Sequence, residues 1–382
     1  MNVFARTDTS LIGRWWWTVD RWLLFSLAIL IAFGLLLTIG ASVAVAERLG
    51  LNSFHFAERQ MAFLVLALGL MFAISLASVR TVRRLAVVMF PVALSLVAAA
   101  TLFGPEIKGS QRWLPLGGFT LQPSEFLKPA FIVVSAWMFA EQERDPVFPG
   151  WRIATALYLM VALLLVSQPD LGQTVLITVV WLAQFFLAGL PLFWVLGLGL
   201  AGILGLVAAY SFLPHVASRI DRFLDPTTGD TYQIDTALNA FRAGGMFGRG
   251  PGEGLVKRVL PDSHTDFIFA VAGEEFGALA CVGLVVLFAV IVVRGLLNLL
   301  REDDYFVFLA TAGLLIQFGL QAFINIAVNL ALLPAKGMTL PFVSYGGSSL
   351  LALSISMGMV LALTRRDTRG GRSARRAWRQ AW

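Results

Sequence analysis

Residues 22–45 read WLLFSLAILIAFGLLLTIGASVAV, a stretch without one charged side chain. A helix that crosses a membrane needs about 17–25 mainly apolar residues, so this stretch predicts a transmembrane span. The chain of 382 residues is 58% hydrophobic and 14% charged, whereas a typical soluble domain is about 25% charged. The composition therefore excludes a water-soluble fold and predicts an all-α polytopic membrane protein.

Nine further apolar windows are long enough to cross the hydrocarbon core, which makes ten predicted transmembrane helices. The windows cover residues 22–45, 60–79, 85–103, 124–140, 153–168, 172–190, 192–212, 265–293, 305–333 and 342–364. With ten spans, both ends of the chain fall on the same side of the membrane.

The distribution of Lys and Arg predicts which side that is. Arginines precede the first window, follow the second and lie between the eighth and ninth, and seven more lie in residues 365–382. Because short cytoplasmic loops are enriched in Lys and Arg, both termini are expected in the cytoplasm. The predicted division is a cytoplasmic segment 1–21, a membrane domain 22–364 and a basic cytoplasmic tail 365–382.

Two loops on the opposite, outer face are longer than connectors need to be. The first covers residues 104–123 and the second residues 213–264. Within the second, residues 230–244 have apolar positions at helical spacing and predict an interfacial helix. The glycine-rich stretch that follows is a weak signal for phosphate binding, and Lys257 with Arg258 is a better pair of anion contacts.

The second loop ends in Ser263-His264-Thr265-Asp266, directly before the eighth window. Ser263 or Thr265 is expected to cap the helix, with Asp266 in its first turn, where the helix dipole favours a carboxylate. Asp266 is therefore either a capping residue or a functional carboxylate at the outer edge of the membrane. The length of the loop favours function, since long loops with little regular structure are usually functional.

Glu274 and Glu275 lie deeper in the same predicted helix. A charge at that depth costs about 2.5–3.5 kcal/mol on insertion scales, so each is expected to face the bundle and have a partner. At 100° per residue, one surface does not hold both of them and Asp266. This favours a structural pairing role for the two glutamates.

The fourth window begins Gln122-Pro123-Ser124-Glu125, with Lys128 three residues further on. Ser124 is the expected cap, and Glu125 and Lys128 share one helix face. Two interpretations remain open: a self-neutralising ion pair, or a cation for an anionic headgroup.

Amide side chains recur every four residues along the ninth window, at Gln317, Gln321, Asn325 and Asn329. Hydrogen bonding within the bundle is the favoured explanation, and a polar transport path is the alternative. Asp170, in a turn after the fifth window, is expected to be a turn or capping residue.

Several of these motifs, in this order, resemble the SEDS family of peptidoglycan glycosyltransferases. The motifs are residues 109–113 (GSQRW), 122–125 (QPSE), 264–267 (HTDF) with Glu274 and Glu275, 333–341 (LPAKGMTLP) and 344–348 (SYGGS). The stretch 13–21 (GRWWWTVDR) is similar to the division branch, FtsW, rather than to the elongation branch, RodA.

The resemblance implies an enzyme that polymerises lipid II at the outer leaflet during cell division. It places the catalytic aspartate at Asp266 and two conserved lysines at Lys128 and Lys336. Lipid II carries its sugar on an α-linked pyrophosphate and the polymer is β-linked, so one base and one source of positive charge suffice for inversion. The remaining predicted substrate contacts are Arg112, Trp113, Gln122, Glu125, Lys257, His264 and Ser344.

Arg112, Lys128, Lys257, Lys336 or a divalent cation are the alternatives for holding the pyrophosphate, and the sequence does not rank them. An arginine of some family members is Thr120 here, so that anionic contact is missing. The implied partners are a class B penicillin-binding protein and other division proteins, at the septum of the bacterial cytoplasmic membrane. The alternatives are a lipid II flippase, an elongation-type polymerase and a scaffold without activity of its own.

Overall fold

The computed structural model describes residues 10–107, 109–212, 217–218, 220–221, 225, 231–334 and 337–365. Ten of its helices correspond one to one to the ten predicted spans. They are α2 (Arg21–Arg48), α3 (His55–Ser75), α4 (Val79–Phe103), α5 (Pro123–Arg144), α6 (Gly150–Ser167), α7 (Leu171–Leu187), α8 (Leu192–Phe212), α11 (Ile268–Leu299), α12 (Tyr305–Asn329) and α13 (Gly347–Leu363). Six of these, α2, α3, α4, α6, α11 and α12, are long and apolar enough by themselves to cross a membrane.

The shorter elements lie near the ends of the bundle. They are α1 (Leu11–Thr18), the strands β1 (Leu114–Leu116) and β2 (Phe119–Leu121), α10 (Tyr232–Gly244) and the 3₁₀ turn η2 (Val256–Arg258). The two strands pair antiparallel and form a hairpin. Helix α10 is the predicted interfacial helix, and Asp230, its expected first residue, lies outside the described residues.

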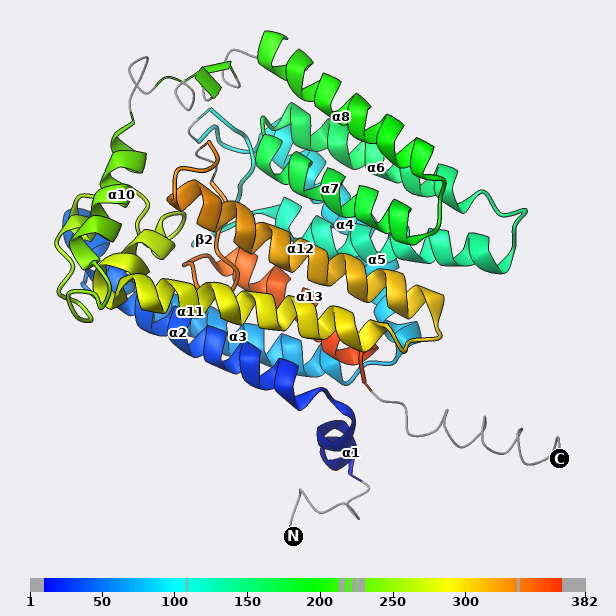
Figure 1. The fold of residues 1–382 in the computed structure, drawn as a ribbon, viewed down its shortest axis with the longest axis horizontal. Coiled ribbons are helices and arrows are strands. Elements are labelled where there is room, and N and C mark those ends of the chain that lie inside the picture. Colours follow the sequence, from blue (N-terminus) through cyan, green and yellow to red (C-terminus); the bar gives the residue numbers. More distant parts are fainter. Residues whose placement is uncertain are drawn as a thin grey trace.

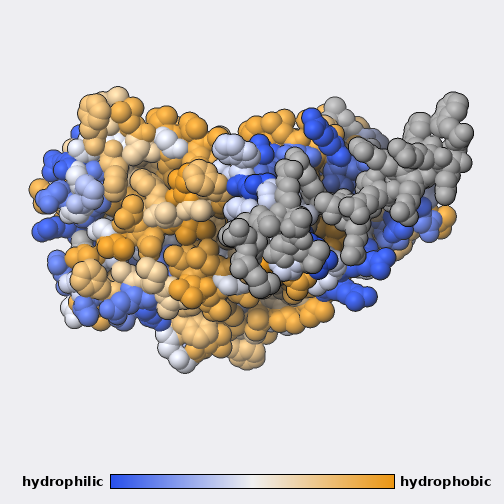
Figure 2. All heavy atoms as spheres, turned by 90° about the horizontal axis from the view of Figure 1, so that it is seen from below, coloured by the Kyte–Doolittle hydropathy of each residue, from blue (hydrophilic) through white to orange (hydrophobic). Residues whose placement is uncertain are grey.

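The spanning helices run side by side along the long axis of the molecule (Figure 1). Helices α5, α12 and α13 pack against one another and are buried along most of their length, so they form the centre of the bundle. The surface in Figure 2 carries a broad hydrophobic band with hydrophilic residues towards the two ends, as expected for a protein surrounded by lipid. The expected all-α polytopic fold is confirmed.

Both described ends of the chain gather at one end of the bundle. The indole N–H of Trp15 in α1 donates to Ser75 Oγ at the end of α3 (2.9 Å). Arg365, directly after α13, donates to the carbonyls of Leu76 and Ala77 at the same place. Helix α10 and the hairpin lie at the other end (Figure 1). This arrangement agrees with an even number of spans.

Helix α11 is interrupted at Gly277, whose φ of 81° lies in the left-handed region that favours glycine. The N–H groups of Ala278 and Leu279 turn outward and donate to the carbonyls of Gly245 and Met246. The carbonyls of Glu274 and Glu275 in turn accept from residues 249 and 250. Hydrogen bonds to the glycine-rich loop thus replace helical ones, which fixes this loop against α11.

Candidate functional site

A cavity of about 630 Å³ opens at the end of the bundle that carries α10 and the hairpin. Loop 104–123, the start of α5, the turn before α11 and residues 337–349 contribute to its wall. Five of the predicted site residues line it: Arg112, Trp113, Gln122, Glu125 and Asp266. Segments far apart in the sequence therefore meet around one volume of the size that ligand sites have.

Asp266 lies in a turn two residues before α11, which begins at Ile268. The expectation that Asp266 occupies the first helical turn, capped by Ser263 or Thr265, is wrong, because Phe267 is the N-cap and makes no side-chain capping bond. Hydrogen bonds from neighbouring segments hold the turn instead. Asn325 Nδ2 and Asn329 Nδ2 both donate to the Asp266 carbonyl (2.9 Å each), which fixes the backbone that carries the carboxylate.

The segment before α13 forms two further hydrogen bonds with this turn. Ser344 Oγ donates to the Thr265 carbonyl (2.5 Å), and the Tyr345 N–H donates to the His264 carbonyl (2.8 Å). His264 also packs its ring against Tyr345, with ring centroids 5.4 Å apart. Neither His264 nor Ser344 lines the cavity. The structure places both behind the wall, where they hold the Asp266 turn.

The amide residues of α12 are used inside the bundle, as predicted. Gln321 Nε2 donates to the Thr339 carbonyl (3.1 Å), and Asn325 Nδ2 also donates to the Met338 carbonyl (2.6 Å). Residues 338–344 are not helical although most of them are buried, and such backbone needs partners in a membrane protein. The amides thus support irregular backbone next to the cavity, and the favoured explanation from the sequence is confirmed for three of the four.

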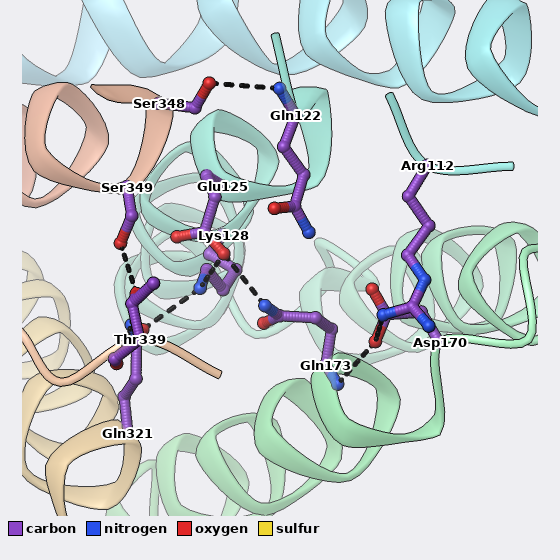
Figure 3. A network of polar contacts seen from close by, with 10 residues as sticks. All are labelled: Arg112, Gln122, Glu125, Lys128, Asp170, Gln173, Gln321, Thr339, Ser348 and Ser349. Carbon is purple, nitrogen blue, oxygen red and sulfur yellow. Dashed lines mark hydrogen bonds and ion pairs between the residues drawn. The ribbon is translucent and has the colours of Figure 1, made fainter. Parts of the chain in front are cut away.

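A polar network forms the floor of the cavity (Figure 3). Glu125 Oε1 accepts from Lys128 Nζ (2.9 Å) and from Gln173 Nε2 of α7 (2.8 Å). Lys128 Nζ also donates to Gln321 Oε1 (3.0 Å). The predicted Glu125–Lys128 pair is confirmed, whereas Ser124 is not the expected cap, since the N-cap of α5 is Gln122 and no side chain caps it.

The network leaves one buried carboxylate oxygen without a hydrogen bond from a described residue. Lys128 is 1% exposed and does not line the cavity. Its ammonium group forms a buried ion pair with Glu125. Glu125 lines the cavity, and its Oε2 is buried and has no hydrogen-bond partner among the described residues. A buried acceptor without a partner is costly, so this oxygen is suited to accept from a ligand or a water molecule.

Arg112 lies at the side of the cavity and pairs with Asp170. Its Nη1 is 3.3 Å from Asp170 Oδ1, and Nη2 donates to Ser110 Oγ (2.8 Å). Asp170 caps α7 by accepting from the Gln173 N–H (3.3 Å), so the predicted capping role is confirmed. Burial raises the pKa of Asp170 above its usual value, and the Arg112 guanidinium opposes that rise.

Lys257 lies outside the cavity, in a cluster on the flank of α11. Its Nζ pairs with Glu275 and donates to the carbonyls of Gly40 (3.0 Å) and Gly252 (3.1 Å). Glu274 accepts from the backbone N–H groups of residues 255, 256 and 257 at 2.7–2.8 Å. The predicted pairing roles of both glutamates are confirmed, but the structure does not bring Lys257 to the other site residues. Lys336 lies outside the described residues.

The sequence analysis missed several residues that line the cavity. Arg59 reaches it from the first turns of α3, and Thr339, Tyr345 and Ser349 reach it from the segment around the start of α13. An arginine at the outer end of an apolar window was a signal for Arg59. Thr339 and Tyr345 belong to stretches quoted for the family resemblance, and Ser349 directly follows one of them, but no chemistry singled them out.

Comparison with known proteins identifies the family. Residues 21–369 match the FtsW/RodA/SpoVE family of cell cycle proteins. The chain belongs to this family. It is 50% identical to a probable peptidoglycan glycosyltransferase FtsW from Caulobacter vibrioides over 96% of this chain and 94% of that protein. A protein of the same name from Aeromonas salmonicida is 34% identical over 94% of this chain and 95% of its own length.

Solved structures of family members have the same fold. One, described as a peptidoglycan synthase complex that coordinates polymerization and crosslinking, matches with a TM-score of 0.75 at 29% identity. Another, the rod shape determining protein RodA of Thermus thermophilus, matches with a TM-score of 0.68 at 28% identity. Each comparison covers 91% of this chain and 97% of the other. Membership thus extends over the helices that build the cavity.

Proposed function

We propose that this chain is a peptidoglycan glycosyltransferase that polymerises lipid II at the outer leaflet of the bacterial cytoplasmic membrane during cell division. The names of the FtsW relatives support the activity and the division role. The observation that carries the proposal is the cavity at the α10 end of the bundle, where Asp266 faces the same volume as Arg112, Gln122 and Glu125.

The reaction that this geometry supports is a single inverting displacement. Asp266 takes the proton of the acceptor sugar hydroxyl, whose oxygen attacks the anomeric carbon of the donor. The bond from that carbon to the pyrophosphate oxygen breaks, and its electron pair leaves with the pyrophosphate. No covalent enzyme intermediate is needed, since one carboxylate base and positive charge near the leaving group suffice.

The floor of the cavity is suited to position the sugar. Glu125 Oε2 is an acceptor without a partner among the described residues, and Gln122 presents an amide to the same cavity. Sugar hydroxyls and N-acetyl groups supply the matching donors and acceptors. Trp113, also in the wall, offers an apolar ring face.

Positive charge for the pyrophosphate is proposed to come from the protein. Arg112 lines the cavity, and its Nε has no partner among the described residues. A divalent cation, held by Asp266 and the phosphates of the substrate, stays the alternative, and Lys336 stays a predicted contact.

The proposed partner is a class B penicillin-binding protein, a transpeptidase with one span, together with other division proteins. The related structure described as a synthase complex for polymerization and crosslinking supports this assignment. We also propose that both termini are cytoplasmic and that the protein acts at the division septum. The shared position of α1 and the end of α13 supports the common side.

A lipid II flippase is the rival function from another class of protein. Such a transporter would use the amides of α12 as a polar path. Gln321, Asn325 and Asn329 are instead engaged with the backbone of residues 266, 338 and 339. A scaffold, the second rival, gives no reason for an open carboxylate oxygen beneath a cavity. The observations favour the polymerase.

The test is polymerisation of labelled lipid II by the purified chain with its transpeptidase partner. We expect the Asp266→Asn variant to form no long glycan while it still binds the partner, and the matched Asp235→Asn variant, altered in exposed α10, to behave as wild type. Wild-type polymerisation by Asp266→Asn would refute the role of Asp266. Loss of transbilayer lipid II movement only on replacing Gln321 and Asn325 would instead favour the flippase.

A further inference from the structure

Arg59 is a cation in the cavity wall that forms no ion pair with a carboxylate among the described residues. It lies at the fifth position of α3 and lines the same cavity as Asp266. Within the described part of the chain, its side-chain hydrogen bond goes to the Gly118 carbonyl at the tip of the β1–β2 hairpin, and no acidic side chain forms an ion pair with it. No described carboxylate therefore offsets the charge of its guanidinium, and most of its donors are left for a ligand.

The other described cations expected to meet the substrate do not have this property, and Lys336 lies outside the described residues. Lys128 is paired with Glu125, Lys257 with Glu275 and Arg112 with Asp170. Lys128 and Lys257 are 1% and 3% exposed, respectively. A buried cation that is already paired with a carboxylate attracts a second anion only weakly, because the carboxylate offsets its charge. Arg59 and Arg112 are the described cations that line the cavity, and of these Arg59 has no acidic partner among the described residues.

The fold holds Arg59 beside the segments that carry the reaction. The next residue, Gln60, accepts from the Gly346 N–H (3.4 Å) and donates to the Ser344 carbonyl (3.5 Å). Ser344 is bonded in turn to Thr265, the neighbour of Asp266. The Arg59 guanidinium also acts electrostatically on the Tyr345 hydroxyl. The start of α3, the segment before α13 and the Asp266 turn thus form one connected wall.

We infer that Arg59 binds the diphosphate of a lipid-linked substrate in this cavity. The inference rests on the proposed function, which supplies the diphosphate. A guanidinium presents a planar fork of donors that matches two phosphate oxygens, and such charge-assisted bonds are the strong ones. The start of α3 adds the positive end of its helix dipole on the same side.

Binding measurements on the full-length chain with its partner test the assignment. The probes are undecaprenyl diphosphate and undecaprenol, which share the lipid chain and differ in the diphosphate, with inorganic pyrophosphate as competitor. Arg59→Gln keeps a donor for the Gly118 carbonyl and removes the charge. Arg59→Lys keeps both. Arg48→Gln, eleven residues earlier at the same end of the bundle and outside the cavity, is the matched control.

We expect Arg59→Gln to weaken binding of undecaprenyl diphosphate about 10- to 100-fold, as for loss of a charge-assisted hydrogen bond. Binding of undecaprenol changes less than about twofold, Arg59→Lys is intermediate, and Arg48→Gln matches wild type. Competition by inorganic pyrophosphate alone would show that the headgroup suffices, and its failure to compete would show that the lipid chain is also needed; either supports the site.

Wild-type affinity of Arg59→Gln for undecaprenyl diphosphate would overturn the inference, as would an equal loss for both lipids, which would reveal a purely structural role. The proposed function fails separately. If Asp266→Asn still polymerised lipid II, the catalytic assignment would fall while the binding result for Arg59 stood.

Discussion

Two buried Glu–Lys pairs, with the same chemistry, do different things in this protein. Glu125–Lys128 lies under the cavity and Glu275–Lys257 lies on the flank of α11, and all four side chains are at most 4% exposed. On the flank, Lys257 has two carbonyls as well as its carboxylate, so its three donors are used. Under the cavity, Glu125 keeps one oxygen without a described partner.

The difference shows that a buried ion pair does not by itself mark a functional site. What separates the two pairs is where each lies and what surrounds it: Lys257 also donates to two carbonyls and lies outside the cavity, whereas Glu125 lines the cavity and its Oε2 has no partner among the described residues. The flank pair holds the glycine-rich loop to α11, whereas the cavity pair includes Glu125, a lining residue with one buried oxygen that has no partner among the described residues. The same residue types at membrane depth therefore serve structure in one place and, under the proposed function, substrate binding in the other.

Variants of the two Glu–Lys pairs, measured for both stability and activity, test this difference most sharply. They are expected to have the largest effects. Lys257→Met and Lys128→Met each leave a buried carboxylate without its partner, which should cost about 3–5 kcal/mol of unfolding free energy. The double variants Lys257→Met/Glu275→Gln and Lys128→Met/Glu125→Gln should regain most of it, because a buried pair replaced by neutral groups is often neutral in stability.

Polymerisation per folded molecule then distinguishes the two pairs. We expect the flank double variant to retain activity within a few-fold and the cavity double variant to lose it, since Glu125 Oε2 is gone. Denaturant unfolding in detergent and lipid II polymerisation are the two measurements. Equal activity of the two double variants would contradict the distinction.

The glycine-rich loop offers a smaller, purely structural contrast. Gly248 (φ 81°) and Gly252 (φ 84°) both adopt left-handed backbone, but a Cβ on Gly248 would lie 2.2 Å from the Glu275 carbonyl oxygen, whereas one on Gly252 meets open space. Gly252→Ala should cost about 1–2 kcal/mol for the backbone conformation. Gly248→Ala should cost about 1–3 kcal/mol more, because it overpacks the contact with α11.

Thermal unfolding of the two alanine variants provides the measurement. The backbone N–H groups of residues 255–257 donate hydrogen bonds to the Glu274 carboxylate. The rate of hydrogen exchange at these groups should rise only in Gly248→Ala. Similar stability of both variants would show that the loop is not held against α11 as described.

The smallest effects are expected in pH dependence, where two capping aspartates differ. Burial alone would raise the pKa of Asp20, the cap of α2, but hydrogen bonds from Asn298, the Leu23 N–H and Arg294 outweigh it and lower that pKa. Its contribution to stability is therefore present above the ordinary value of 3.8 and is lost as the pH falls through the lower folded value. Asp20→Asn should be less stable than wild type at neutral pH, by about 1 kcal/mol or less, and the gap should close in acid.

Asp170 should show the opposite sign. Because burial raises its pKa, stability that depends on this group falls as the pH rises from 3.8 through the higher folded value. Thermal unfolding of Asp20→Asn and Asp170→Asn against pH, with exposed Asp303→Asn as control, measures both trends. Parallel profiles of the two variants would contradict these assignments.

Much of the fold could be predicted from the sequence, because apolar length alone specifies a span. The boundaries of the ten windows and the ten helices agree to within about six residues, and those of α7, which follows directly on the turn at Asp170, agree to within about three. The exact start of α11 could not be predicted. It depends on amides of α12 that fix the Asp266 carbonyl, and those contacts join residues about sixty positions apart.

The site was predicted only in part, because a sequence shows which residues carry charge but not which distant residues they contact. Asp266, Arg112 and Glu125 carry charge where a membrane protein has few, so each stood out by itself. Lys257 stood out equally, and only its contacts with Gly40 and Glu275 show that it belongs to the flank. Arg59 is identified because it has no acidic partner in the part of the chain that the structure describes, and a sequence does not reveal such pairing.

Photocrosslinking of lipid II tests most directly whether the cavity, rather than the flank, holds the substrate. A photoreactive benzoylphenylalanine replaces Phe119, which lines the cavity, or Phe247, which lies beside Gly248 and is 82% exposed against 45% for Phe119. The account predicts strong crosslinking from position 119 that unlabelled lipid II suppresses, and only background from position 247. Crosslinking that follows exposure, stronger at 247 and insensitive to competition, would contradict it.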